Sequence, residues 1–111
     1  MKTEETGTQP PPLTEDRLKR LVLAAMEDGD SFGNPETYHA RYGHLERGLQ
    51  IDDVLHGLER DWKFGRPPVF NKNFWQWKYY IETESIDGKP MTVILAVDTA
   101  DRSFEVITRW N

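Results

Sequence analysis

The chain has 111 residues, the length of one ordinary domain, and its 37% hydrophobic and 12% aromatic content suffices for one small core. A formal net charge of −5 argues against a protein that coats nucleic acid non-specifically, because such binding depends on an excess of Lys and Arg. The absence of cysteine excludes disulfides, thiolate catalysis and cysteine-bound metal centres. No stretch approaches the roughly 20 apolar residues that span a bilayer, and no secretory signal is evident, so we expect a cytoplasmic protein without a membrane partner.

Residues 1–12 predict a disordered tail, because they hold no aliphatic side chain beyond Met1 and end in three prolines. Residues 13–111 are expected to form a single α+β domain. Its first helix should begin after Thr14, whose hydroxyl can cap the first turn, and end at Gly29. Three- and four-residue spacing predicts one buried helix face, made of Leu18, Leu21, Val22, Ala25 and Met26.

Two further helices are expected. The first spans residues 35–47, because Asn34 can cap it, Pro35 suits the first helical position and Gly48 can end it. The second spans residues 52–60, with an apolar stripe at 54, 55 and 58. The link over 48–51 is short, so these two helices are expected to be neighbours.

After residue 62 the apolar period changes from about 3.6 residues to two, which is typical of strands. Residues 75–83 predict a half-buried strand, Asp87-Gly88 a hairpin turn, 91–97 a central strand and 104–110 a final strand. A short strand at 68–71 is restricted to a sheet edge by its prolines. The predicted fold therefore has two to three N-terminal helices packed on one face of a three- to four-stranded antiparallel sheet.

The segment 35–47 is the richest in chemistry. On a helix, Arg41, His44 and Arg47 form one stripe, and together with His39 this cluster suits phosphate, with a histidine available for proton transfer. The alternative is a solvated helix face. A metal site is not expected, because His39 and His44 are five residues apart rather than four and His56 lies on another helix. No cofactor motif is present.

A second candidate is a basic stretch among aromatic rings. Residues 60–80 contain five basic side chains and a single acidic one, Asp61. Basic side chains among rings suit single-stranded RNA, charge for the backbone and rings for the bases. The alternative assigns the rings to the core and leaves only the charges in solvent. The five basic residues are Arg60, Lys63, Arg66, Lys72 and Lys78.

Three segments within residues 37–111 resemble, in their order and spacing, a bacterial family of uncharacterised small proteins. They read HARYGHLERGLQIDDVLHGL, WKYYIETESIDGKPMTVILAVD and FEVITRW. That family is similar to toxins of the BrnT and RelE type, compact α+β endoribonucleases that pair with antitoxins. The resemblance implies a RelE-like fold, RNA as substrate and a cognate antitoxin or other protein as partner.

The same resemblance implies site residues, since His39, Arg47 and Thr108 match the family's polar positions. By this analogy His39 and Arg47 are the catalytic residues, with His39 as general acid or base and Arg47 as a phosphate clamp. The family's second helical arginine is Gly43 here, so Arg41 or His44 stands in for it. The implied substrate-binding set is Arg41, His44, Lys78, Thr108 and Arg109.

Gly43 and the overall acidity also favour an alternative, a non-catalytic protein-interaction module that is an inactive relative or an antitoxin- or immunity-like partner. Whether the chain is an enzyme stays open at this stage.

Overall fold

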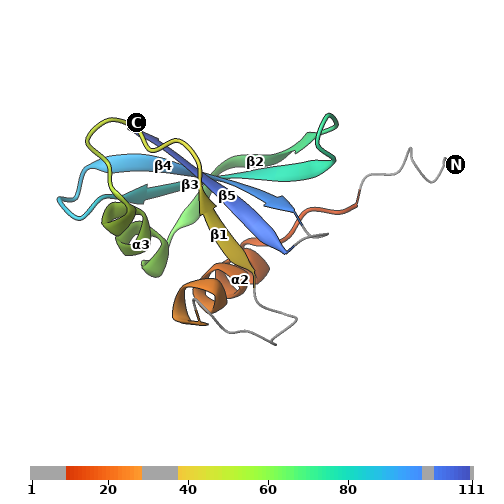
Figure 1. The fold of residues 1–111 in the computed structure, drawn as a ribbon, viewed down its shortest axis with the longest axis horizontal. Helices are drawn as coiled ribbons and strands as arrows, with labels where there is room; N and C mark the ends of the chain where they lie inside the picture. The colour runs from red at the N-terminus through yellow and green to blue at the C-terminus, as the bar shows by residue number, and fades with distance from the viewer. Residues whose placement is uncertain (1–9, 29–37, 99–101, 111) are drawn as a thin grey trace, which may run out of the picture.

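A strongly twisted sheet is the central element of the protein, shown in Figure 1. A computed structural model describes residues 10–28, 38–98 and 102–110. Within these ranges the fold is α+β, as expected. The elements, in chain order, are α2 (Glu15–Asp28), β1 (His39–Tyr42), α3 (Ile51–Glu59), β2 (Lys63–Asn71), β3 (Gln76–Glu84), β4 (Pro90–Asp98) and β5 (Ser103–Trp110).

The sheet has five strands in the order β1-β5-β4-β3-β2. Strands β2 to β5 follow one another as an antiparallel meander, whereas β1 lies parallel to β5 at the outer edge, with His39 opposite Ser103 and Tyr42 opposite Val106. The expectation of a three- to four-stranded antiparallel sheet is therefore wrong in both strand number and direction. The parallel strand brings residues 39–42 beside the last strand of the described chain.

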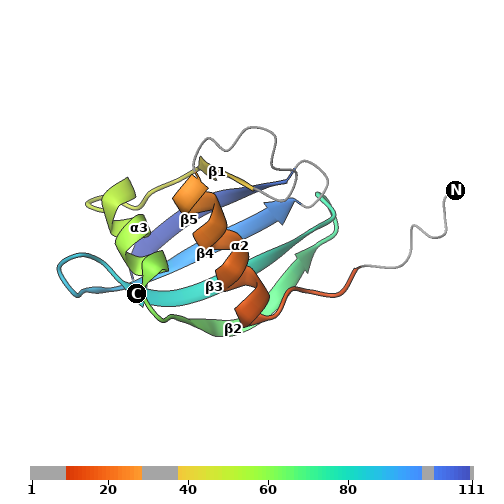
Figure 2. The same ribbon diagram turned by 90° about the horizontal axis from the view of Figure 1, so that it is seen from below.

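Helices α2 and α3 cover one face of the sheet (Figure 2). The core between them is built from alternate residues of β3, β4 and β5, which meet the apolar stripes of the two helices. Trp62, directly after α3, is buried and donates its indole N–H to the Leu58 carbonyl at 3.2 Å. The core thus follows the alternation that the sequence predicted for residues 75–83, and β4 lies inside the sheet, as predicted for a central strand at 91–97. No helix in the described part of the chain is long and apolar enough to cross a membrane.

Helix α2 forms where the sequence placed it. The Thr14 hydroxyl accepts a hydrogen bond from the Arg17 backbone N–H at 3.2 Å, so it caps the first turn. Leu18, Val22 and Ala25 are buried on the sheet side of the helix. Gly29, the expected last residue, lies outside the described residues.

The helix predicted over 35–47 is wrong for residues 38–47, while 35–37 lie outside the described residues. Residues 39–42 form β1 and residues 43–50 are an irregular loop. Tyr38 and Ala40 pack against the core, so the segment alternates with a period of two. Pairing with β5 therefore outweighs the local helix signals, and the helical stripe of Arg41, His44 and Arg47 does not exist.

The strand predictions hold with small shifts. Gly88 adopts a φ of +80° in the β3–β4 turn and donates its N–H to Ser85 O at 2.9 Å, as the Asp87-Gly88 signal predicts. Strand β2 lies at the sheet edge, as its prolines require, but is longer than expected. Trp75 precedes β3 in a turn with a φ of +51° instead of belonging to the strand.

Candidate functional site

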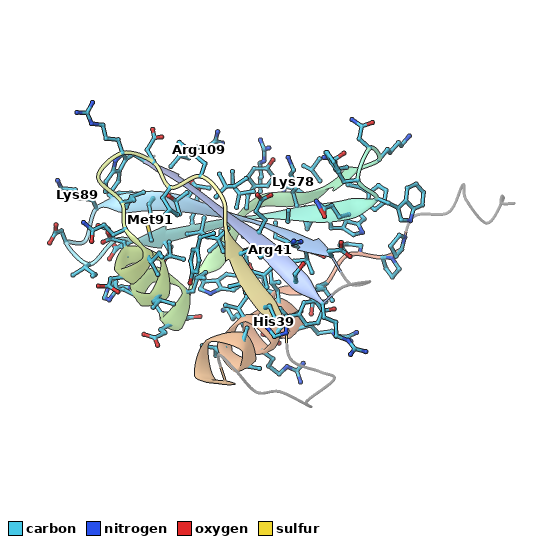
Figure 3. All side chains as sticks on the ribbon, viewed as in Figure 1. His39, Arg41, Lys78, Lys89, Met91 and Arg109 are labelled. Carbon is cyan, nitrogen blue, oxygen red and sulfur yellow. The ribbon has the colours of Figure 1, made fainter. Side chains whose placement is uncertain are left out.

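The face of the sheet opposite α2 and α3, called the open face below, carries no helix among the described residues. Strand residues alternate between the two faces, so the neighbours of buried Tyr79 and Val106 point away from the core. Figure 3 shows Lys78 and Arg109 on this side of the sheet. The charged side chains that line hollows on the open face are Arg41, Arg66, Lys78, Glu82, Asp98, Glu105 and Arg109.

Four strands each contribute at least one cation to the open face. Arg41 from β1 and Lys78 from β3 occupy the same cross-strand row, with β4 and β5 between them. Strands lie about 4.8 Å apart, so these two residues are about 14 Å apart at their Cα atoms. Arg109 from β5 lies further along the sheet, opposite Thr92 of β4. The fourth cation, Arg66 of β2, stacks its guanidinium over the Tyr80 ring at 3.7 Å from the centroid.

The cations differ in how far they are already engaged. The Arg41 Nη2 donates to the Ser103 hydroxyl at 2.9 Å, which orients the guanidinium along the end of β5. Lys78 and Arg109 make no ion pair within the described ranges. These two side chains are therefore the ones most available to an anionic ligand.

Two acidic side chains of the open face, Glu105 and Glu82, each lie over a glycine of the neighbouring chain segment. A Cβ atom added at Gly43 would be 2.7 Å from the Glu105 Oε2, and one added at Gly65 would be 2.6 Å from the Glu82 Cγ. Each acidic side chain thus occupies space that any larger residue would take. The open face is consequently mixed in charge rather than uniformly basic.

At least three hollows lie on the open face. The first, called the larger hollow, has a volume of about 360 Å³, and the second, called the smaller hollow, has a volume of about 150 Å³. A third, of about 160 Å³, is lined by Lys78 and shares Phe74, Gln76, Ala96 and Glu105 with the larger hollow. Each hollow has at least one cation and one acid in its wall, so each suits a polar ligand. The larger is lined by Arg41, Phe74, Gln76, Ala96, Asp98 and Glu105, and the smaller by Gly65, Arg66, Tyr80, Glu82, Thr92 and Arg109.

The structure does not bring the predicted catalytic pair together. His39 lies opposite Ser103 at the start of β5, and Figure 3 shows it at the α2 end of β1. Arg47 lies in the loop after β1, and its carbonyl accepts a hydrogen bond at 2.9 Å from the indole N–H of Trp110, at the other end of β5. Seven residues of strand separate these ends, which is about 23 Å.

The remaining predicted residues lie in three places: the open face, the core and the loop after β1. Arg41, Lys78 and Arg109 lie on the open face. Thr108 is fully buried on the helix side, where its hydroxyl accepts from the Glu46 backbone N–H at 3.1 Å. His44 is exposed in the same loop, with its ring 3.4 Å from the Glu46 carboxylate. Thr108 of β5 therefore holds the loop that follows β1, His44 lies in that loop, and neither is on the open face.

Sequence reasoning left out Tyr80, Glu82 and Glu105 as site residues. The signal was present for two of them, because Lys78, Tyr80 and Glu82 alternate with the buried residues of β3. Glu105 could be assigned only once β1 was known to lie beside β5. Among the described residues, no group of three or more His, Asp or Glu side chains is placed to hold a metal ion.

Comparison with known proteins adds no relative. No family model matches the chain, and neither does any curated protein or solved structure with which it was compared. The resemblance to BrnT- and RelE-type toxins therefore stays a prediction, and the site has to be interpreted from its own geometry.

Proposed function

We propose that the open face binds a short segment of single-stranded RNA. The observation that carries the proposal is that Arg41, Lys78 and Arg109, three residues of the implied substrate-binding set, come from three strands onto this one face. Cations on neighbouring strands of one sheet are already positioned, so less conformational entropy is lost when they contact backbone phosphates. Arg66 adds a fourth positive charge from β2.

Aromatic side chains on and beside the open face support the same proposal. Phe74, in the β2–β3 turn, is 72% exposed and lines the larger hollow. Arg66 and Tyr80 form a stacked pair in the smaller hollow. Single-stranded bases stack on rings and on guanidinium planes, so each hollow offers one stacking surface beside a cation.

The acids on the open face limit how the RNA is bound. Glu82, Asp98 and Glu105 repel phosphates, so only the positions of the cations suit the backbone. We therefore expect a footprint of a few nucleotides and moderate affinity, which agrees with the net charge of −5. With about three phosphates neutralised, the slope of log K against log salt should be about −2.

Cleavage of RNA, as the resemblance implies, is proposed for the same face. There Lys78 and Arg109 would neutralise the charge that develops on the phosphate. The separation of His39 and Arg47 does not support the residue roles that the resemblance implies for that pair. RNA binding is accordingly the proposal with the stronger structural support.

The test uses fluorescence anisotropy with a labelled heptauridine in low salt. Lys78→Gln and Arg109→Gln should each weaken binding by about tenfold, because each removes one charge-assisted phosphate contact. Each should also make the salt slope less negative by about 0.7. Lys89→Gln is the matched control, because it changes the net charge equally from the β3–β4 turn (Figure 3). An equal loss in the control, or no binding by the unaltered protein, contradicts the proposal.

A protein partner, such as an antitoxin, is the second candidate. Phe74 and Trp75 are 72% and 46% exposed at the β2–β3 turn, and large exposed rings are enriched at protein interfaces. Co-expression with the product of the adjacent gene, followed by size-exclusion chromatography, tests this candidate. A complex that Phe74→Ser disrupts would support it, whereas a complex that survives the change would place the interface elsewhere.

A further inference from the structure

A second surface, on the helix side of the sheet, is built from aromatic side chains and already holds a segment of this chain. We call it the aromatic groove and define it by Trp75, Trp77, Tyr79 and Val97. The segment Pro10–Leu13 lies in it, just before α2, close to the β2–β3 end of the sheet (Figure 2). Residues 10–12 belong to the predicted tail, of which residues 1–9 are not described.

The two ends of the segment are held by hydrogen bonds. The Trp77 indole N–H donates to the Pro10 carbonyl at 2.8 Å. The Leu13 backbone N–H donates to the Tyr79 hydroxyl at 2.9 Å. Between these points the three prolines have no N–H to offer. The groove therefore supplies a donor for the Pro10 carbonyl and an acceptor for the Leu13 N–H, so both polar ends of the segment are bonded.

This arrangement has the chemistry of polyproline recognition. Consecutive prolines favour an extended helix with solvated carbonyls, which loses little entropy when it docks on aromatic rings. An indole N–H directed at a proline carbonyl fixes where such a segment lies. The aromatic groove has this donor, and its rings line the same hollow as Pro10 and Pro11.

The rings of the groove are held in position from β2. Phe70 contacts Trp75 edge-on with a centroid distance of 4.9 Å and contacts Trp77 at 5.2 Å. Trp75 adopts a φ of +51°, a left-handed conformation that costs a bulky residue about 1 kcal/mol or more. Trp75 is 46% exposed. This backbone conformation therefore leaves a large, partly exposed side chain at the rim of the groove.

We propose that the aromatic groove is a recognition site for extended proline-rich segments of a partner protein, occupied in the free protein by Pro10–Leu13. The chain's own segment shows which ligand chemistry the groove accepts. Because Thr14 and α2 follow immediately, this segment competes at high effective concentration, so the partner's segment binds only when the chain's own segment is displaced.

The rings of the groove lie on the other face of β3 from the cation of the proposed RNA site, although Gln76 lines a hollow of each. Trp77 and Tyr79 alternate along β3 with Lys78 and Tyr80, so the two surfaces lie on opposite faces of the same strand. A change in the proline segment should leave RNA affinity unchanged. The two proposals can therefore fail separately.

The test follows the indole N–H resonance of Trp77 by nuclear magnetic resonance in the full chain, assigned by its loss in Trp77→Phe. A triple variant, with Pro10, Pro11 and Pro12 each changed to alanine, should shift this resonance towards that of an unbonded indole. The synthetic peptide TQPPPLT, which reproduces residues 8–14, should then restore the original position, whereas TQAAALT should not. The unaltered protein should respond to neither peptide at the same concentration.

A second variant tests the role of the indole donor. Trp77→Phe in the triple-alanine background keeps a ring in the groove but removes its N–H, so binding of TQPPPLT, followed by isothermal titration calorimetry, should weaken about five- to tenfold. If the triple variant does not fold, the double change of Pro10 and Pro11 replaces it. An unchanged Trp77 resonance in the opened variants, or equal binding of both peptides, overturns the proposal. A concentration-dependent dimer of the opened variants would assign the groove to a second copy and also overturn it.

Discussion

Thr108→Val separates a binding role for this residue from a structural one. The resemblance assigns Thr108 to the substrate, whereas the structure buries it completely and uses its hydroxyl to hold the loop after β1. Valine has nearly the same shape and suits a strand, so the change leaves no cavity. What disappears is the acceptor for the Glu46 backbone N–H.

The expected cost follows from that one contact. A hydrogen bond of this kind contributes about 0.5–1.5 kcal/mol, and Glu46 is half-buried, so water can replace part of it. We expect the free energy of unfolding to fall by about 1 kcal/mol. For a domain of this size that corresponds to a decrease in Tm of about 4–8 °C.

Urea unfolding followed by tryptophan fluorescence measures the effect. The midpoint should decrease by about 0.5–1 M with an unchanged slope, and heptauridine affinity should stay within about twofold of the unaltered protein. A variant that keeps its midpoint but loses RNA binding would refute the reasoning, because the hydroxyl would then serve the ligand and not the loop.

Three further changes give distinct results. Gly57→Ala should destabilise the protein by about 1 kcal/mol in urea, because the new Cβ would lie 2.8 Å from Thr83 Cγ2 and 3.1 Å from the Glu84 backbone oxygen. Such overpacking costs about 1–3 kcal/mol and exceeds the helix-propensity gain of about 1 kcal/mol. Burial raises the pKa of Tyr79 above its ordinary value of 10.0. The neutral phenol therefore contributes stability that is fully present below pH 10, and this stability is lost as the pH rises through the pKa of the folded state. Tyr79→Phe should therefore reduce the loss of stability above about pH 10 in a pH series of thermal melts. Arg47→Ala should leave RNA affinity and Tm unchanged, because only the Arg47 carbonyl has a described role.

Local signals predicted most elements, because the residues that define them are neighbours in sequence. The cap at Thr14 and the spacing of Leu18, Val22 and Ala25 are sufficient for α2. The two-residue period along β3 and the Asp87-Gly88 turn are sufficient for the central hairpin. In each case the signal and the structure it specifies lie within a few residues of each other.

Strand β1 could not be predicted in the same way. The segment has capping signals for a helix before it and a glycine after it, and those local preferences favoured the wrong element. Its strand conformation depends on hydrogen bonds to β5, such as His39 N–H to Arg102 O at 2.9 Å and Gly43 N–H to Val106 O at 2.8 Å. The alternation of Tyr38, Ala40 and Tyr42 was the one local trace of this pairing, and it is too short to outweigh a helix pattern.

The wrong prediction for β1 also explains why the predicted catalytic pair, His39 and Arg47, is not brought together. A helix over 35–47 would have placed His39 and Arg47 two turns apart, whereas a strand followed by a loop places them at opposite ends of β5. Lys78 and Arg109 lie on the solvent-facing side that strand alternation gives them, because alternation assigns sides without any knowledge of strand order. Only the strand order shows which of these residues lie in the same cross-strand row.

The parallel pairing of β1 with β5 has a consequence for biosynthesis. His39 pairs with Ser103, 64 positions later, so β1 has no partner until β5 has left the ribosome. Until then, Tyr38 and Ala40 expose apolar surface that the mature protein packs against its core. Pairing at this edge therefore waits until β5 has emerged, and nascent chains that end before β5 should be substrates for chaperones and proteases.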